Sequence, residues 1–300
     1  MKKFFNAVWR IIRFPFWLIF TILASPFRLI GRGIRFINTD ADDRPILDTF
    51  TSLATEEQAR ASFWDHVEAL RGHLLRMVIG LAIGVGISFY FAKPLMEYIA
   101  GPVGGLAKLI AIQPTEEIGV FMRVALMSGI AITLPYLAFE IWLFAAPGLT
   151  SREKKNTLVG IPIATVLFLG GMAFTFYVLL PSALPFLGNF TAIAQTWRAG
   201  DYFGFVTGLM IWIGIFFEFP LVIYLLTSIG LVQPALLAKQ WRIAIVIIAV
   251  IAAAVTPTVD PVNMALVMLP MSLLYFVSIG LSYVAYAGRQ RNLSATEESV

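Results

Sequence analysis

Six long runs of hydrophobic residues alternate with polar stretches along the chain from Ser62 onward. A stretch of about 20 apolar residues is long enough to cross a bilayer as a helix. The runs are Leu74–Ala92, Val120–Phe144, Leu158–Leu180, Phe203–Ile229, Trp241–Val255 and Val262–Tyr286. The pattern therefore predicts an all-α polytopic membrane protein with six transmembrane helices.

The fifth run is too short to cross a bilayer of ordinary thickness. Trp241–Val255 contains 15 residues, which is about 22 Å of helix at 1.5 Å per residue. A typical hydrocarbon core is about 30 Å thick. Either the bilayer thins around this helix or the helix lies in a recess of the protein.

The first 61 residues have a different pattern. Their uncharged run, Phe14–Phe27, is short for a span and has basic residues on both sides. A cleaved signal peptide is the alternative, but the basic residues after the run fit one poorly. We predict a basic and apolar segment on the cytoplasmic membrane surface. The expected organisation is this segment at 1–37, a polar acidic linker at 38–61, a six-helix membrane domain at 62–287 and a cytoplasmic tail at 288–300.

Composition supports a membrane protein, because 59% of the residues are hydrophobic and 13% are charged, whereas soluble domains carry about 25% charged residues. The chain has no cysteine and two histidines, which excludes disulfides, thiolate metal sites and a His-rich metal cluster. We interpret the net charge of +4 as loop charge that meets anionic headgroups, not as a nucleic-acid footprint.

Basic residues predict the orientation, because they are enriched in cytoplasmic loops. One set of loops carries ten Lys and Arg residues and the other set carries four. The richer set consists of Arg60, Arg71, Arg76, Arg152, Lys154, Lys155, Lys239, Arg242, Arg289 and Arg291. We expect that side, with both termini, to be cytoplasmic.

No catalytic constellation appears: the sequence lacks a Ser/His/Asp set, a nucleotide-binding glycine loop and an HExxH motif. We therefore expect no enzyme activity, cofactor or metal. Glycines inside the spans, such as Gly84 and Gly171, are better explained by close helix packing.

Glu218 is the deepest ionisable residue, within the fourth run and two residues before Pro220. A charge at a helix centre costs about 2.5–3.5 kcal/mol on insertion scales, which makes such a group a functional candidate. The alternative is a protonated acid that hydrogen-bonds to a neighbouring helix. Pro220 removes a backbone donor, so we expect the helix to kink and Glu218 to face a hydrated recess beside the fifth helix.

Glu140 lies near the end of the second run, where Phe144 fits an interfacial aromatic belt. Pro147 then stops the helix, and Glu153 follows among basic residues. The plainer interpretation is a helix-capping acid among solvated charges, because Thr150 and Glu153 have capping-box spacing. Before the first run, "SFWDHVEALRGHLLR" (62–76) has charges at helical spacing, which indicates an amphipathic start to a membrane helix or a juxtamembrane anchor.

Six stretches together resemble the TatC family, the large polytopic subunit of the twin-arginine protein translocase. They are "FWDHVEALRGHL", "IQPTEEIGVFMRV", "IWLFAAPGLTSREKK", "LGGMAFTFYVLLP", "GIFFEFP" and "VTPTVDP", in the order expected of that family. The resemblance covers about residues 62–287.

The resemblance implies a glove-shaped fold with short fifth and sixth helices, in the inner membrane of a prokaryote. It also implies a receptor for twin-arginine signal peptides of folded cargo, which self-associates and assembles with small single-span TatA/TatB-type subunits. The residues expected to bind the signal peptide are Glu153, Glu68, Phe144, Pro147 and Arg71. The residues expected to be intramembrane polar or partner contacts are Glu218, Pro220, Asp260 and Pro102.

The chain departs from the family pattern at three positions. The usual acid of the N-terminal motif is replaced by Ala69, and Glu68 lies one residue earlier, about 100° around a helix. His73 stands at the last basic position of the motif, and Phe276 stands where the family often has Glu. These changes weaken the expectation for part of the signal site and for one partner contact.

Two other functions were considered. A proton-coupled transporter would use Glu218 and Glu140 as a relay, but no inverted repeat relates 74–180 to 203–286. An intramembrane enzyme would need a nucleophile–base pair or a metal set, and the sequence offers neither.

Overall fold

The computed structural model describes residues 57–149, 151–189, 196–256 and 261–297. The predicted surface segment at 1–37 and nearly all of the linker at 38–61 lie outside these residues. The helices are α3 (Glu57–Ile99), α4 (Glu116–Ala145), α5 (Ser151–Leu158), α6 (Gly160–Phe174), α7 (Leu180–Asn189), α8 (Ala199–Phe217), α9 (Phe219–Ser228), α10 (Pro234–Lys239), α11 (Trp241–Val255) and α12 (Pro261–Glu297).

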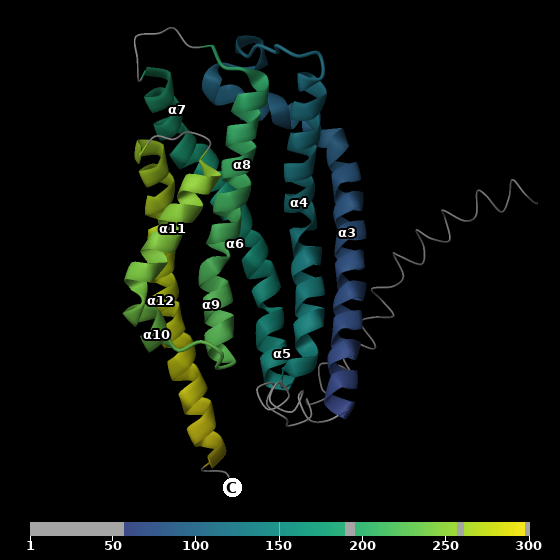
Figure 1. Ribbon diagram of the computed structural model, residues 1–300, viewed down its shortest axis with the longest axis vertical. Helices are drawn as coiled ribbons and strands as arrows, with labels where there is room; N and C mark the ends of the chain where they lie inside the picture. The colour runs from purple at the N-terminus through teal and green to yellow at the C-terminus, as the bar shows by residue number, and fades with distance from the viewer. Residues whose placement is uncertain (1–56, 150, 190–195, 257–260, 298–300) are drawn as a thin grey trace, which may run out of the picture.

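The all-α prediction is confirmed, because the described part of the chain contains five helical stretches long and apolar enough to cross a membrane, together with the shorter α11. The fifth helix is 15 residues long, with the bounds that the pattern predicts. The fourth span consists of α8 and α9, which follow one another along the same direction (Figure 1).

Three features differ from the expectations. Helix α3 is 43 residues long and continues past Lys93 to Ile99, because Pro94 lies inside the helix without ending it. Helix α7 occupies a stretch that was expected to be a loop. The sixth helix is not short: α12 has 37 residues, because no proline or turn cluster follows Tyr286 to end it.

The helices run roughly along the long axis of the molecule, with α3 at one edge and α11 and α12 at the other (Figure 1). Helix α3 packs on α4, α4 and α6 pack on α8, and α9 and α11 pack on α12. Side chains of α8, including Tyr202, Phe203 and Leu209, are almost completely buried. Outward-facing side chains such as Val78 and Val250 are exposed, as expected for surfaces that face lipid.

Glycines allow close helix crossings at some of the predicted positions but not at Gly86 or Gly170, where a Cβ atom would meet nothing within 4 Å. A Cβ atom on Gly84 would collide with Thr133 Cγ2, where α3 meets α4. A Cβ atom on Gly171 would lie 2.8 Å from the Cα atom of Gly214, where α6 meets α8. Small residues at such crossings let backbones approach in a membrane.

The two ends of the bundle are built differently. At the end opposite α5, the buried Glu116 accepts hydrogen bonds from Gly200 N at 2.6 Å and from Arg198 Nε at 3.1 Å. The backbone of Ile110 also pairs with Trp197 and Ala199. These bonds fasten the stretch before α4 to the stretch before α8. We call the other end, where α3 begins and α4 ends, the α5 end (Figure 1).

Candidate functional site

The α5 end is built on the last turns of α4. This helix ends at Ala145, and a 3-10 turn that contains the exposed Pro147 follows, as the sequence predicts. The indole Nε1 of Trp142 donates a hydrogen bond to Thr157 Oγ1 at 2.9 Å, and both residues are buried. This bond holds α5 against the end of α4.

Phe144 lies in a cluster of rings between α4 and α3. Its ring centroid is 4.6 Å from that of His66 and 5.9 Å from that of His73. The two histidines are seven residues apart, so they share one face of α3. The half-buried Phe144 therefore joins the end of α4 to the motif that resembles the family's N-terminal signature.

The other predicted signal-site residues are arranged unevenly around this cluster. Glu68 and Arg71 are exposed on α3. At 100° per residue, each lies about 150° from the face that carries His66 and His73. Glu153 belongs to α5, but its side chain lies outside the described residues. The geometry therefore brings Phe144, but not Glu68 or Arg71, to the contact between α3 and α4.

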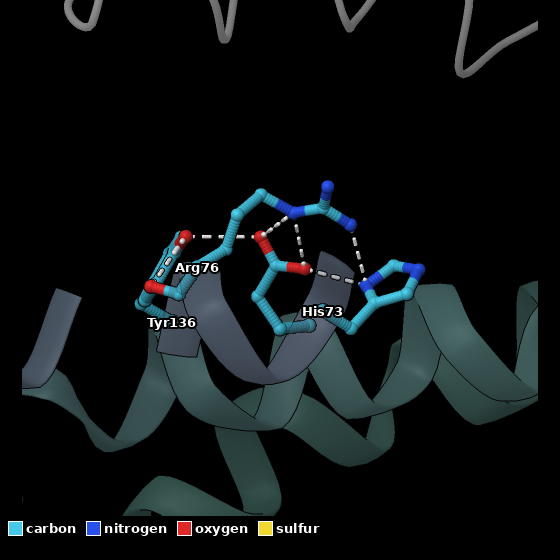
Figure 2. A network of polar contacts seen from close by, with 4 residues as sticks. His73, Arg76 and Tyr136 are labelled. Atoms are coloured by element: carbon cyan, nitrogen blue, oxygen red, sulfur yellow. Dashed lines mark hydrogen bonds and ion pairs between the residues drawn. The ribbon is translucent and has the colours of Figure 1, made fainter. Parts of the chain in front are cut away.

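Glu140 is the centre of a polar network that sequence reasoning missed (Figure 2). Its carboxylate accepts a bond from Tyr136 Oη at 2.9 Å and contacts His73 Nδ1 at 2.7 Å. Arg76 Nε donates to both of its oxygens at 3.1 Å. Glu140 is 4% exposed, so this acid is buried at the contact between α3 and α4. The available signal was the helical spacing of His73 and Arg76 on one helix and of Tyr136 and Glu140 on the next.

Glu218 lies at the break between α8 and α9. It is the residue between Phe217 and Phe219, and Pro220 is buried at the start of α9. The fourth span is thus interrupted at the position where the sequence predicts a kink. Glu218 is half-buried, and its Oε1 atom is buried without a hydrogen-bond partner in the described part of the chain. That the surroundings of Glu218 form a hydrated recess beside α11 stays a prediction.

The remaining predicted positions lie elsewhere. Pro102 is exposed in a 3-10 turn at the end opposite α5. Asp260 lies outside the described residues. Phe276, at the position where an acid was expected, is half exposed on α12. Among the described residues, no group of three or more His, Asp or Glu could hold a metal ion.

Glu140 and Glu218, the pair required for a proton relay, belong to different contacts. Glu140 bonds to α3, whereas Glu218 lies at the break between α8 and α9, close to where α6 crosses α8. Within the described ranges, no hydrogen bond joins the two acids. The described residues therefore give no direct contact that would support the relay.

The comparison with protein families decides the identity. The family model of the Sec-independent protein translocase protein (TatC) matches residues 65–270, which is more than half of the chain. The chain belongs to the TatC family. The resemblance found in its motifs is thereby confirmed.

Relatives in distant bacteria agree with this membership. TatC of Koribacter versatilis is 30% identical over 82% of this chain and 94% of its own. TatC of Aquifex aeolicus is 34% identical over 74% of this chain and 94% of its own. A crystal structure of the twin-arginine translocase receptor TatC superposes with a TM-score of 0.66 at 34% identity, over 73% of this chain and 99% of that one. This TatC-family chain is therefore a polytopic membrane subunit of the Sec-independent protein translocase.

Proposed function

We propose that this chain is the receptor subunit that binds twin-arginine signal peptides at the α5 end, and that this end, with both termini, faces the cytoplasm. The observation that carries the proposal is the contact of Phe144 with the two histidines of α3. It joins the two motifs in which the family resemblance expects signal contacts. An arginine guanidinium stacks on aromatic faces and makes bidentate bonds to carboxylates.

The binding roles follow from this chemistry. Glu153 supplies the carboxylate for one arginine, and Phe144 and Pro147 form the apolar surface beside it. Glu68 and Arg71 form the rim on the other side of α3. The structural relative named a twin-arginine translocase receptor supports this assignment.

Glu153→Gln tests the signal site. We expect it to weaken binding of a twin-arginine peptide by about 1.5–3 kcal/mol, the range for a hydrogen bond to a charged group. This is roughly a 10- to 150-fold rise in Kd. Titration of a fluorescent peptide onto purified protein measures it. Glu117→Gln, an exposed acid at the opposite end, serves as the control and should bind as wild type does. Equal affinity for the Glu153→Gln variant and wild type would refute the assignment.

The assembly role centres on the broken fourth span. A half-buried carboxylate with an unpaired oxygen can accept a hydrogen bond from a polar group on another helix. We propose that small single-span TatA/TatB-type subunits, or the signal peptide itself, supply that group, and that copies of this chain also self-associate. Asp260 and Pro102 are proposed as further contacts in this assembly.

A further inference from the structure

The Glu140 network holds its arginine in an unfavourable geometry. The strongest guanidinium–carboxylate pairing is a fork, with two N–H groups directed at the two oxygens. Here Arg76 directs a single group, Nε–H, at both oxygens at 3.1 Å. Its Nη2 atom is directed instead at His73 Nδ1, at 2.8 Å. The carboxylate is therefore paired with a guanidinium that does not use its fork.

His73 cannot satisfy both of its polar contacts in this network. The Nδ1 atom of His73 lies 2.7 Å from Glu140 Oε2 and 2.8 Å from Arg76 Nη2. A ring nitrogen either donates or accepts, so it cannot donate to the carboxylate and accept from the guanidinium at the same time. One of these two contacts is always unsatisfied. Removal of the Arg76 guanidinium from this position would leave His73 free to donate to Glu140.

The partners differ in their access to solvent. The Glu140 side chain is 5% exposed, whereas the Arg76 side chain is 50% exposed. Half of the Arg76 side chain thus lies at the surface of the bundle, whereas Glu140 lies inside it. Without Arg76, the buried Glu140 would keep only Tyr136 and His73 as partners. A buried carboxylate is stabilised by a paired cation, and the cation that Glu140 now has, Arg76, is half exposed.

The network also lies on the face of α3 where signal binding is proposed. His73 contacts both Glu140 and the Phe144 ring. Ala69, at the position of the missing acid, is about 40° from His73 around the helix, whereas Glu68 is about 140° away. Glu140, which contacts His73, therefore lies on the side of α3 that carries Ala69, whereas Glu68 does not.

Resting on the function proposed above, we propose that Glu140 forms a second guanidinium subsite of the signal site and that Arg76 occupies it in the absence of signal. An arginine of the signal peptide displaces Arg76 and pairs with Glu140. The exchange of one guanidinium for another keeps the buried charge balanced. The ligand class is a planar guanidinium, so lysine, which lacks the fork, is a poor substitute.

Chemical rescue tests whether the subsite accepts a guanidinium. The Arg76→Ala variant should have a lower Tm than wild type, and millimolar ethylguanidinium should raise that Tm by several degrees. Ethylammonium should not. The same additives should leave two controls unchanged: Arg76→Ala/Glu140→Gln, which lacks the carboxylate, and Arg242→Ala, which loses an exposed arginine on α11. Equal effects of both additives, or no effect of either, would overturn the subsite.

Peptide binding tests the exchange. If the Arg76→Ala protein folds poorly, the Arg76→Lys variant is measured in its place, because lysine keeps the positive charge but lacks the planar guanidinium. Either variant should bind a twin-arginine peptide about tenfold more tightly than wild type, because the internal competitor is weakened. A twin-lysine peptide should gain less, and the added Glu140→Gln change should abolish the gain. Unchanged or weaker binding would show that Arg76 only holds α3 and α4 together and does not compete with the peptide. Failure of wild type to bind the twin-arginine peptide would refute the receptor function, while the rescue experiment still decides on the subsite.

Discussion

At the scale of single residues, Glu218 has a buried oxygen atom, Oε1, without a hydrogen-bond partner in the described part of the chain. A chain selected only for stability would replace such a group, because burying an unpaired polar atom costs about 1–3 kcal/mol. The unpaired Oε1 atom lies at a helix break made by Pro220, which lacks the donor that would continue the ladder. Function is the reason we give for its retention.

Glu218→Leu and Glu218→Gln separate polarity from stability. We expect Glu218→Leu to insert normally and to match or exceed the wild-type Tm, because it removes an unpaired group, yet to lose export. Glu218→Gln should keep much of the export if hydrogen bonding, not charge, is what matters. Export of a twin-arginine reporter and thermal unfolding of the purified protein measure the two effects. Wild-type export by the Glu218→Leu variant would show that Glu218 is a tolerated buried acid.

At the scale of elements, the crossing of α6 and α8 depends on the absence of side chains. A Cβ atom on Gly171 would lie 2.8 Å from Gly214 Cα and 3.0 Å from the Ile213 carbonyl oxygen. Both are backbone atoms, so the helices would have to separate. This crossing lies just before the helix break and therefore sets the position of Glu218.

Gly171→Ala should destabilise the bundle by about 1–3 kcal/mol, the usual cost of overpacking. Gly170→Ala is the matched control, because its Cβ atom would meet open space. That change should be neutral or stabilising by up to about 1 kcal/mol, since alanine is the better helix former. Thermal unfolding in detergent compares the two variants. If the Gly171→Ala and Gly170→Ala variants had equal Tm values, the close contact of α6 with α8 at Gly171 would be contradicted.

Some of these helices and contacts could be predicted from the sequence, and others could not. The bounds of α11 follow from an apolar run between polar residues, and the break between α8 and α9 follows from Pro220, because both signals are local. Helix α7 was missed because the third apolar run ends at Leu180, so the pattern predicts a connecting stretch after it, whereas the chain stays helical through Pro185. The Glu140–Arg76 contact joins residues 64 positions apart. Only the packing of α3 on α4 brings them together, so no local pattern could identify them as partners.

At the scale of the whole molecule, the two ends of the bundle have different tasks. Glu116 fastens two connecting stretches together at one end. The α5 end instead carries Phe144 and the Glu140 network. The excess of basic residues on the loops of the α5 end supports its cytoplasmic orientation.

Cysteine labelling tests the orientation directly, because the chain has no native cysteine. Ala235→Cys, near the α5 end, should react with a membrane-impermeant maleimide only from the cytoplasmic side. Ala111→Cys, at the opposite end, should react only from the other side. Both positions are exposed. The reverse labelling pattern would invert the proposed topology.

The central claim is that the α5 end receives the paired arginines of a signal peptide. Its most direct test is a photo-crosslinking residue at Ala145, which is exposed beside Phe144, with the same residue at Ala111 as the control. In native membranes, a twin-arginine precursor should crosslink at position 145 and not at position 111. Replacement of both arginines by lysine should remove most of the product. Crosslinking at 145 that is equally strong with the twin-lysine precursor, or that occurs only at 111, would contradict the account.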